Sequence, residues 1–296
     1  MTVGYAMTGP DVAFAEQRIS PKGKRRLRSG GRLVRNIVAY VVGIIVIAPV
    51  LLLVLDSIKP ESQVYTLPPS LVFKPTLANF RLNIDSGYVH YLINSVVIVL
   101  GSTCVAAILG VPAAFKLVVC GTKHNRDILF WFLATKFLPV VGVIVPLYVI
   151  YNRMHLLDTW VGLGFIYTAM ALPLVVLIMR AYLADVPGEL LDAAQVDGAG
   201  LLVGLARVIV PLAVPGIITA CLLSFIFSWN EFFVALMLTT TKAATLPVFI
   251  ASSQTTMGLG LGSLSAAAVL AASPVVLVGW VAQRNLASGL TLGAIK

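Results

Sequence analysis

Long apolar stretches separated by short polar segments are the dominant pattern along this chain. Six of them approach or exceed the ~20 mostly apolar residues that an α-helix needs to cross a hydrocarbon core of ~30 Å. They cover residues 36–55, 92–119, 128–151, 161–179, 212–238 and 263–282. Strands of a membrane barrel would alternate apolar and polar residues, and these stretches do not. The pattern therefore predicts an all-α polytopic membrane protein with six transmembrane helices.

Composition supports this prediction. Hydrophobic residues make up 59% of the 296 residues and charged residues only 11%. A soluble globule of this size needs more polar surface than such a chain can supply.

The distribution of basic residues predicts the orientation. A cluster precedes the first apolar stretch, and cytoplasmic loops of membrane proteins carry an excess of Lys and Arg. If that end is cytoplasmic, the same side also receives Lys116, Lys123, Arg126, Arg180, Arg207, Arg284 and Lys296, whereas the other side receives only Lys59, Lys74, Arg81, Arg153 and Lys242. Both termini are therefore expected in the cytoplasm. The net charge of +9 is explained by this topology and by anionic lipid rather than by nucleic acid.

The remaining segments predict three parts. Residues 1–35 mix Gly, Ser, Pro and cations without periodicity and are expected to form a basic cytoplasmic tail. Residues 36–285 form the six-helix domain, with a cytoplasmic loop at 185–211, and residues 286–296 form a second cytoplasmic tail. The proline-rich segment 56–91 is expected to be an extended outer loop that an external partner can touch. His90, His124 and His155 lack metal-ligand spacing, so no metal site is expected.

The loop at 185–211 carries helix signals of its own. Asp185 can cap a helix, Pro187 suits a first turn, and Glu189 and Asp192 complement the positive end of a helix dipole. Apolar residues then recur at helical spacing on one face, at Leu190, Ala193 and Ala194.

Gly198 permits a turn into a second short helix before Pro211. The loop is therefore expected to be a small helix-turn-helix beneath the membrane.

These residues resemble the "EAA" loop of importer permeases in the ABC transporter superfamily. Asp192, Val208 and Val210 stand where the family pattern has Glu, Ile and Leu. In that family the loop is a coupling helix that fits a cleft in the ATPase subunit. The resemblance implies ATPase coupling through Glu189, Asp192, Ala193, Ala194, Asp197, Gly198 and Pro211.

Further matches extend the resemblance over the chain. Residues 228–232 resemble the "WNE" signature of the maltose-type branch, and residues 289–296 resemble its C-terminal tail. Residues 135–150, 156–168 and 264–280 are similar to permeases for sugar alcohols such as mannitol and sorbitol. The resemblance implies the fold of a type I ABC importer permease in the bacterial inner membrane, and a sugar or polyol as its solute.

The energy source is expected to lie in another subunit, because the chain has no Gly-rich phosphate-binding loop of the ATPase kind. The resemblance implies a heterodimer with a second permease, an ATPase dimer that binds ATP and Mg, and an extracytoplasmic solute-binding protein. The chain itself is expected to be a transporter subunit without cofactor or enzymatic activity.

Lys136 is the informative charge within a predicted span. An ammonium in hydrocarbon costs ~2.5–3.5 kcal/mol on insertion scales, so it should face the protein interior, water or a partner. Two interpretations stand equally: Lys136 lines the solute path or a gate, or it has a structural role, as a tether to carbonyls freed near Pro139 or by snorkelling toward the cytoplasmic edge.

Glu231 is the obvious partner for Lys136, but depth along straight helices argues against a pair. Lys136 lies ~12 Å and Glu231 ~28 Å from the inner ends of their predicted spans. Glu231 is instead placed with Trp229 and Asn230 in the outer half, either contacting solute or at an interface. Further candidates for solute contact, with an ordinary membrane-interface or interhelical role as the alternative, are Tyr148, Tyr151, Tyr167 and Gln254.

Two other classes of membrane protein compete with this interpretation. An ion-coupled secondary transporter of a small polar solute could share six spans, but it would be expected to show paired intramembrane acids or repeats. An intramembrane hydrolase would need a base, and Ser102, Ser224 and Ser228 have none visible within the spans.

Overall fold

The computed structural model describes residues 24–66, 70, 72–119, 121, 123–255 and 260–291. It divides into two units, Met1–Leu52 and Leu53–Lys296, each of which is described by itself. All regular elements within the described ranges are helices.

The first unit contains most of helix α1 (Lys24–Ser57), which continues into the second unit. The helix begins at Lys24 and not at residue 36, so the last part of the expected tail is helical. Residues 1–23 of that tail lie outside the described residues. The segment Val34–Ser57 is long and apolar enough to cross a membrane.

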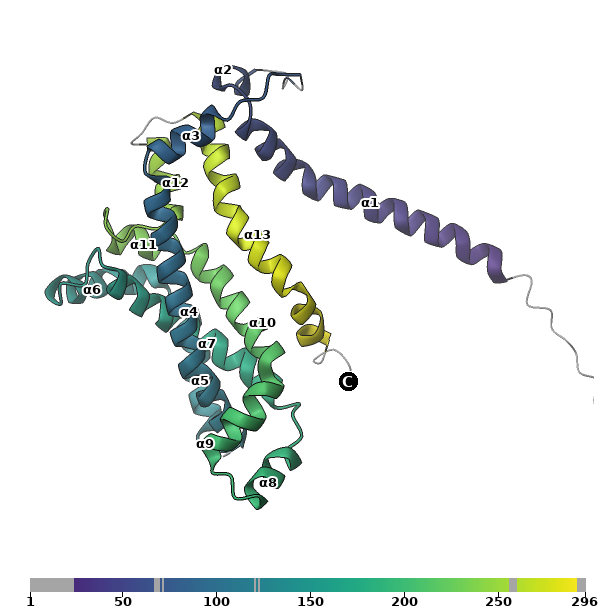
Figure 1. The fold of residues 1–296 in the computed structure, drawn as a ribbon, viewed down its shortest axis with the longest axis vertical. Helices are drawn as coiled ribbons and strands as arrows, with labels where there is room; N and C mark the ends of the chain where they lie inside the picture. The colour runs from purple at the N-terminus through teal and green to yellow at the C-terminus, as the bar shows by residue number, and fades with distance from the viewer. Residues whose placement is uncertain are drawn as a thin grey trace, which may run out of the picture. The chain divides into compact units, whose positions relative to one another are not determined.

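Four long helices form the body of the second unit: α4 (Tyr88–Val119), α7 (Trp160–Leu183), α10 (Val210–Trp229) and α13 (Leu261–Thr291). Helix α10 packs against each of the other three, and α4 packs against α7 (Figure 1). Small residues let the backbones approach closely. A Cβ atom at Gly110 would lie 2.7 Å from Val175, and one at Gly216 would lie 2.5 Å from Tyr182.

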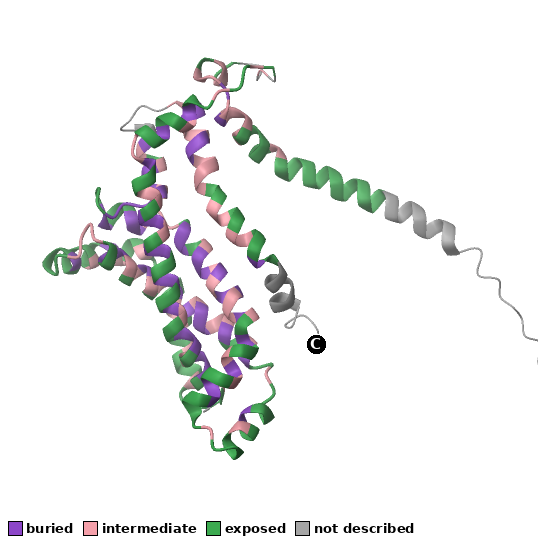
Figure 2. Ribbon diagram, in the orientation of Figure 1, coloured by how far each residue is buried: buried purple, intermediate pink, exposed green. Residues whose placement is uncertain are grey.

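Buried side chains gather on the facing sides of these helices, and exposed ones cover the other sides (Figure 2). Two apolar clusters result. One surrounds Tyr167, Phe225 and Phe249, and the other surrounds Phe115, Val175 and Met179. The second cluster continues to Leu191 and Leu205, so it connects the bundle to the segment that follows α7.

The third apolar stretch is not one helix, so the prediction of a continuous span at 128–151 is wrong. Helices α5 (Asn125–Phe137) and α6 (Val140–Arg153) are bent by 91° relative to each other. Pro139 lacks a backbone N–H, and Leu138 before it is extended, with ψ 122°. The described residues therefore contain five helices that could span a membrane, or six spans if this bent pair counts as one.

The fifth stretch differs from its prediction at both ends. A continuous helical segment runs from Leu201 to Trp229 through α9 (Leu201–Gly204), a π-helical turn η1 (Leu205–Ile209) and α10. Pro211 follows directly after the π-helical turn η1, where the hydrogen-bond pattern departs from that of an α-helix, and the helical segment continues through it. Helix α10 ends at Trp229, and two shorter helices follow, α11 (Phe233–Leu238) and α12 (Leu246–Thr255).

The outer segment 56–91 is not uniformly extended, which corrects that expectation. It contains α2 (Glu61–Val64) and α3 (Ala78–Asp85), and of its described prolines Pro60 and Pro75 lie outside both helices. Asn83 Nδ2 donates a hydrogen bond of 2.8 Å to the Ser263 carbonyl, which fastens α3 to the start of α13.

Candidate functional site

A small polar cavity lies among α5, α7 and α10. Its volume is about 90 Å³, and its polar side chains are Lys136, Tyr167, Ser224, Ser228 and Glu231. Apolar side chains complete the lining, namely Met170, Ala171, Leu174 and Phe227. The cavity therefore brings an ammonium, a carboxylate and three hydroxyl groups together at the surface of an otherwise apolar bundle, with the Lys136 side chain exposed.

Lys136 reaches this cavity from the end of α5, just before the break at Pro139. Its Nζ donates a hydrogen bond to the Met170 carbonyl on α7. Pro173 lies three residues later in α7 and disturbs the helical hydrogen bonding of that turn. The tether interpretation had expected an acceptor among the carbonyls near Pro139. The acceptor is instead a carbonyl of α7.

Glu231 reaches the same cavity from the break between α10 and α11. Its Oε1 accepts a hydrogen bond of 3.0 Å from the Val234 backbone N–H, at the start of α11. The Tyr167 hydroxyl donates a 3.0 Å hydrogen bond to the Glu231 backbone carbonyl. These contacts hold the carboxylate beside the cavity and tie α7 to the break.

The two charges line one cavity, so the difference in depth inferred for them is wrong, whereas the expectation that they form no direct pair agrees with the contacts of the described residues. That inference assumed two straight helices, whereas α5 bends at Pro139 and α10 ends at Trp229. Among the described residues, no ion pair within 4.0 Å joins Lys136 to Glu231. The two groups share a cavity without contacting each other directly.

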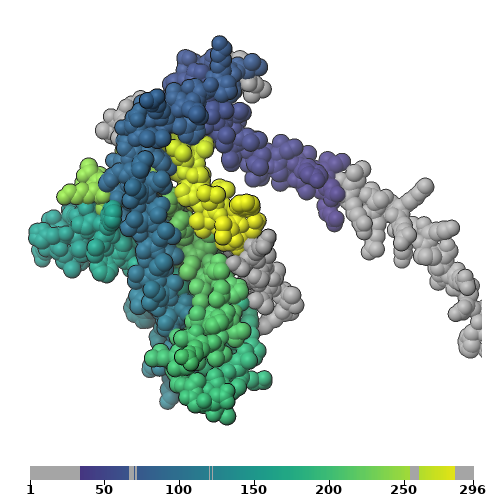
Figure 3. All heavy atoms as spheres, in the orientation of Figure 1, coloured from purple at the N-terminus to yellow at the C-terminus, as the bar shows by residue number. Residues whose placement is uncertain are grey.

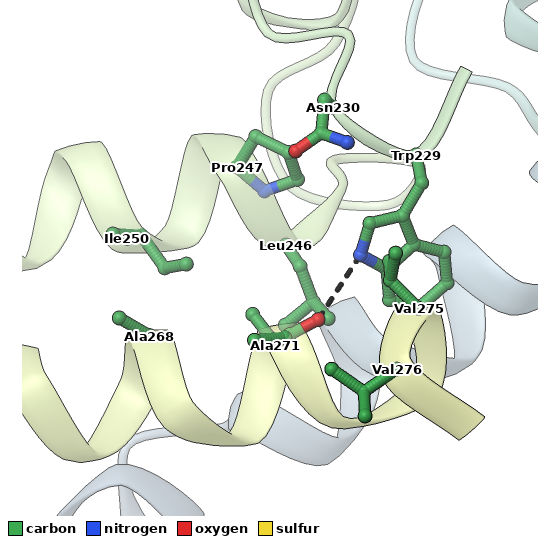
Figure 4. Close-up of a pocket in the computed structure, with 10 residues that line it drawn as sticks. Trp229, Asn230, Leu246, Pro247, Ile250, Ala268, Ala271, Val275 and Val276 are labelled. Carbon is green, nitrogen blue, oxygen red and sulfur yellow. Dashed lines mark hydrogen bonds between the residues drawn. The ribbon is translucent and has the colours of Figure 1, made fainter. Parts of the chain in front are cut away.

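Trp229 and Asn230 line a different cavity from Glu231. This second cavity, of about 450 Å³, lies between the end of α10 and the helices α12 and α13, and its lining is mostly apolar (Figure 4). The Trp229 indole N–H donates a 3.1 Å hydrogen bond to the Ala271 carbonyl, and its ring stacks on Phe225. Asn230 Nδ2 donates to the Ile226 carbonyl and ends α10. Both side chains contribute to packing within the chain.

Of the four remaining candidates, Tyr167 lines the first cavity, whereas the Tyr151 hydroxyl donates a 3.0 Å hydrogen bond to the Gly162 carbonyl. Tyr148 is 46% exposed on α6 and is not among the residues that line that cavity. Gln254 belongs to α12, but its side chain lies outside the described residues.

Sequence reasoning missed two contributors to the first cavity. Ser224 was noted only as a serine without a base, and the Met170 carbonyl was not considered. The spacing of Ser224 and Ser228 by one helical turn was the available signal, because residues four apart lie on one face.

The segment after α7 forms the predicted helix-turn-helix, with corrected boundaries. Helix α8 (Glu189–Val196) begins after Gly188, without a side-chain cap, so the prediction of a cap at Asp185 is wrong. Gly198 has φ +84° and makes the turn, in a conformation that a β-carbon would resist. The second helix continues through Pro211 into α10, contrary to the expectation that it ends before that proline.

Helix α8 has one buried side chain. Leu191 is 4% exposed and packs against Gly204, where a Cβ atom would lie 2.8 Å from the leucine side chain. The other side chains of the candidate coupling set on α8 are exposed or half-buried: Glu189, Asp192, Ala193 and Ala194. Leu190 and Val196 are exposed as well. The segment lies on the surface at one end of the second unit (Figure 3) and offers a free face there.

A clamp at the opposite end orders the loop between α11 and α12. Asp158 accepts five hydrogen bonds from residues 240–243, through four backbone N–H groups and the Thr240 hydroxyl. Partial burial would raise the pKa of the Asp158 carboxyl, but these hydrogen bonds outweigh burial and hold the pKa well below its usual range. Asn94 donates to the carbonyls of Lys242 and Ala244 and so fastens the loop to α4.

No group of three or more His, Cys, Asp and Glu side chains that could hold a metal ion occurs in the part of the chain that the structure describes.

Comparison with known proteins gives consistent results. Residues 106–291 match the family described as binding-protein-dependent transport system inner membrane component. The chain is 36% identical to the trehalose transport system permease protein SugB of Mycobacterium tuberculosis, over 84% of this chain and 92% of that protein. It is 33% identical to the sulfoquinovosyl glycerol transport system permease protein SmoH of Agrobacterium fabrum, over 90% and 94% of the two chains.

A solved structure shares the fold. A chain of a bacterial ABC transporter involved in the import of the acidic polysaccharide alginate superposes with a TM-score of 0.74, at 20% identity and over 88% of this chain and 97% of that one.

Proposed function

The chain belongs to the family of inner-membrane components of binding-protein-dependent transport systems, and from this premise we propose that it forms half of the translocation path for a neutral sugar or sugar alcohol. It is a multi-pass permease subunit of an ABC importer and not an enzyme. Such permeases work with a separate ATPase and a substrate-binding protein.

The exposed ammonium of Lys136 carries the proposal. Its side chain is exposed on the isolated chain at the level of Met170, near the middle of α7. An ammonium that faced lipid at that depth would cost ~2.5–3.5 kcal/mol, so this face must be covered by water or protein in the assembled transporter. We place the solute path, or the second permease that encloses it, against this face.

The choice of solute class rests on two observations. The charges that line the small cavity balance, which suits a neutral solute more than an ion. One relative is named for transport of trehalose, a neutral polyhydroxylated compound, and a second for sulfoquinovosyl glycerol, which is polyhydroxylated but carries a sulfonate. Sequence likeness to mannitol and sorbitol permeases favours a sugar alcohol within this class.

Energy coupling is assigned to α8. In this proposal its exposed face docks on the ATPase dimer, which binds ATP and Mg, while Leu191 holds the helix to the bundle. A second, different permease completes the path as a heterodimer, and the segment 56–91 with the clamped loop meets the binding protein outside. Solute then passes by alternating access as the ATPases close and reopen.

Cysteine labelling tests the assignment of the Lys136 face. The variant Lys136→Cys, with the native cysteines Cys104, Cys120 and Cys221 replaced by alanine, is labelled in the assembled complex with a water-soluble methanethiosulfonate. We expect faster labelling than at Ile108→Cys, an apolar side chain that is 70% exposed on α4. Equal and slow labelling at both positions would show that water does not reach this face and would contradict its assignment to the solute path.

A further inference from the structure

The cavity among α5, α7 and α10 contains hydrogen-bonding groups that the chain leaves unused. Lys136 Nζ has three donors, and one of them goes to the Met170 carbonyl. Glu231 uses Oε1 to accept from the Val234 N–H, and no hydrogen bond to its Oε2 occurs among the described residues. The Lys136 ammonium can therefore still donate hydrogen bonds, and the Glu231 carboxylate can still accept them, at the same cavity.

Ser224 supplies an independent observation. Its side chain is 1% exposed and lines the cavity, yet its hydroxyl has no hydrogen-bond partner among the described residues. A serine within a helix usually donates to a carbonyl one turn earlier, as Thr219 and Ser253 do here. A buried hydroxyl without a partner is less favourable than alanine, so Ser224 points to a ligand in the cavity.

The size of the cavity limits that ligand. About 90 Å³ holds a few water molecules or a short hydroxylated fragment, and it is too small for a sugar ring. A carboxylate, an ammonium and a hydroxyl match adjacent hydroxyl groups, which donate to the first and accept from the other two.

We propose that Lys136, Ser224 and Glu231 form a subsite that binds the terminal hydroxyl groups of a neutral polyhydroxylated solute during its passage. The subsite rests on the proposed function, because it assigns the solute contact within that path. Tyr167 acts as a positioning residue, since its hydroxyl fixes the Glu231 backbone.

The test uses the complete importer in proteoliposomes with its binding protein. Uptake of radiolabelled D-mannitol, D-glucitol and trehalose identifies a transported solute, and the analogue that lacks its terminal hydroxyl is compared with it. Ser224→Ala and Glu231→Gln are the informative variants, because alanine removes only an unpaired hydroxyl and glutamine still accepts from the Val234 N–H. Ser102→Ala is the matched control, since Ser102 is buried in α4 and already donates to the Val99 carbonyl.

We expect Ser224→Ala to lower kcat/KM for the solute about three- to tenfold, and Glu231→Gln about ten- to a hundredfold, as for loss of one neutral or one charged hydrogen bond. Uptake of the deoxy analogue should change much less, and the control should match the wild type. Assembly should be unchanged in Ser224→Ala, and the control Ser102→Ala should also keep the basal ATP hydrolysis of the wild type.

Two results would overturn the proposed subsite and leave the proposed function standing. The variants would slow uptake of the solute and of its deoxy analogue equally, or they would slow uptake of neither. Recovery of uptake by the exchange of Lys136→Glu with Glu231→Lys would also overturn it, because that result indicates a direct ion pair. If the wild type takes up none of the three solutes, the proposed solute class fails and the subsite fails with it.

Discussion

Asp158 shows how one carboxylate can order a whole segment. It lies in a left-handed conformation, with φ 54°, between α6 and α7. From there both of its oxygens accept hydrogen bonds from residues 240–243. Its own backbone N–H donates to the Leu238 carbonyl. Two loops far apart in the sequence therefore behave as one rigid surface.

Asp158→Asn should destabilise this surface. Loss of the charged acceptor should lower the stability of the solubilised chain by about 1–2 kcal/mol, read as a lower melting temperature. Asp85→Asn is the control, because Asp85 is exposed and lies 4.0 Å from Arg81.

The pH dependence of that difference has a defined sign. The pKa of Asp158 is lowered in the folded chain, so its contribution is complete above the unfolded value of about 3.9 and falls as the pH drops below it. The gap in melting temperature between wild type and Asp158→Asn should stay constant from pH 8 to pH 5 and narrow below about pH 4. A gap that closes between pH 7 and pH 5 would contradict this account.

Sequence reasoning identified residues by type better than it placed them. Lys136 and Glu231 stand out because charges are rare in apolar stretches. Their common cavity could not be foreseen, because it depends on the bend at Pro139 and on the end of α10 at Trp229. Trp229 was expected near solute or at an interface, but its indole is satisfied by α13, a contact that no local pattern indicates.

At the scale of elements, the position of α8 on the bundle depends on a single leucine. The helix is short, and Leu191 is its one buried side chain among the described residues. Helices of this length are not stable by themselves, so their position comes from packing. Leu191 packs where Gly204 leaves room for it, next to the π-helical turn that leads into α10. We therefore expect movement of α8 to reach α10 through this contact.

Leu191→Ala should uncouple α8 from the bundle. A buried leucine replaced by alanine typically costs about 2–5 kcal/mol, which exceeds what so short a helix can supply otherwise. We expect a severalfold loss of ATP hydrolysis stimulated by the binding protein, with basal hydrolysis retained.

Leu202→Ala provides the comparison for this variant. Leu202 is 78% exposed on α9, so its truncation should have little effect. Equal stimulation in Leu191→Ala and the wild type would show that α8 does not depend on this contact.

The sequence predicted helices correctly where hydrophobicity alone determines where they begin and end. The stretches at 92–119 and 161–179 correspond to α4 and α7 within a few residues. The third and fifth stretches were misjudged because proline acts by position. Pro139 breaks a helix where its predecessor is extended, whereas Pro211 lies within a continuous helical segment, directly after the π-helical turn η1.

At the scale of the whole second unit, the two ends differ in what they present. One end carries α8 beside the ends of α4 and α7, with a cavity of about 240 Å³ between them. The other end carries α3 and the clamped loop (Figure 1). The small polar cavity lies between these ends, near the middle of α7. This arrangement suits a subunit that is driven from one side and receives solute at the other.

Uptake by the reconstituted importer tests the central claim most directly. Proteoliposomes contain this chain, the second permease and the ATPase, and they receive the loaded binding protein outside. We predict that uptake requires ATP at the ATPase side and continues when ionophores abolish all ion gradients. Uptake that follows an ion gradient in the absence of ATP would contradict the account.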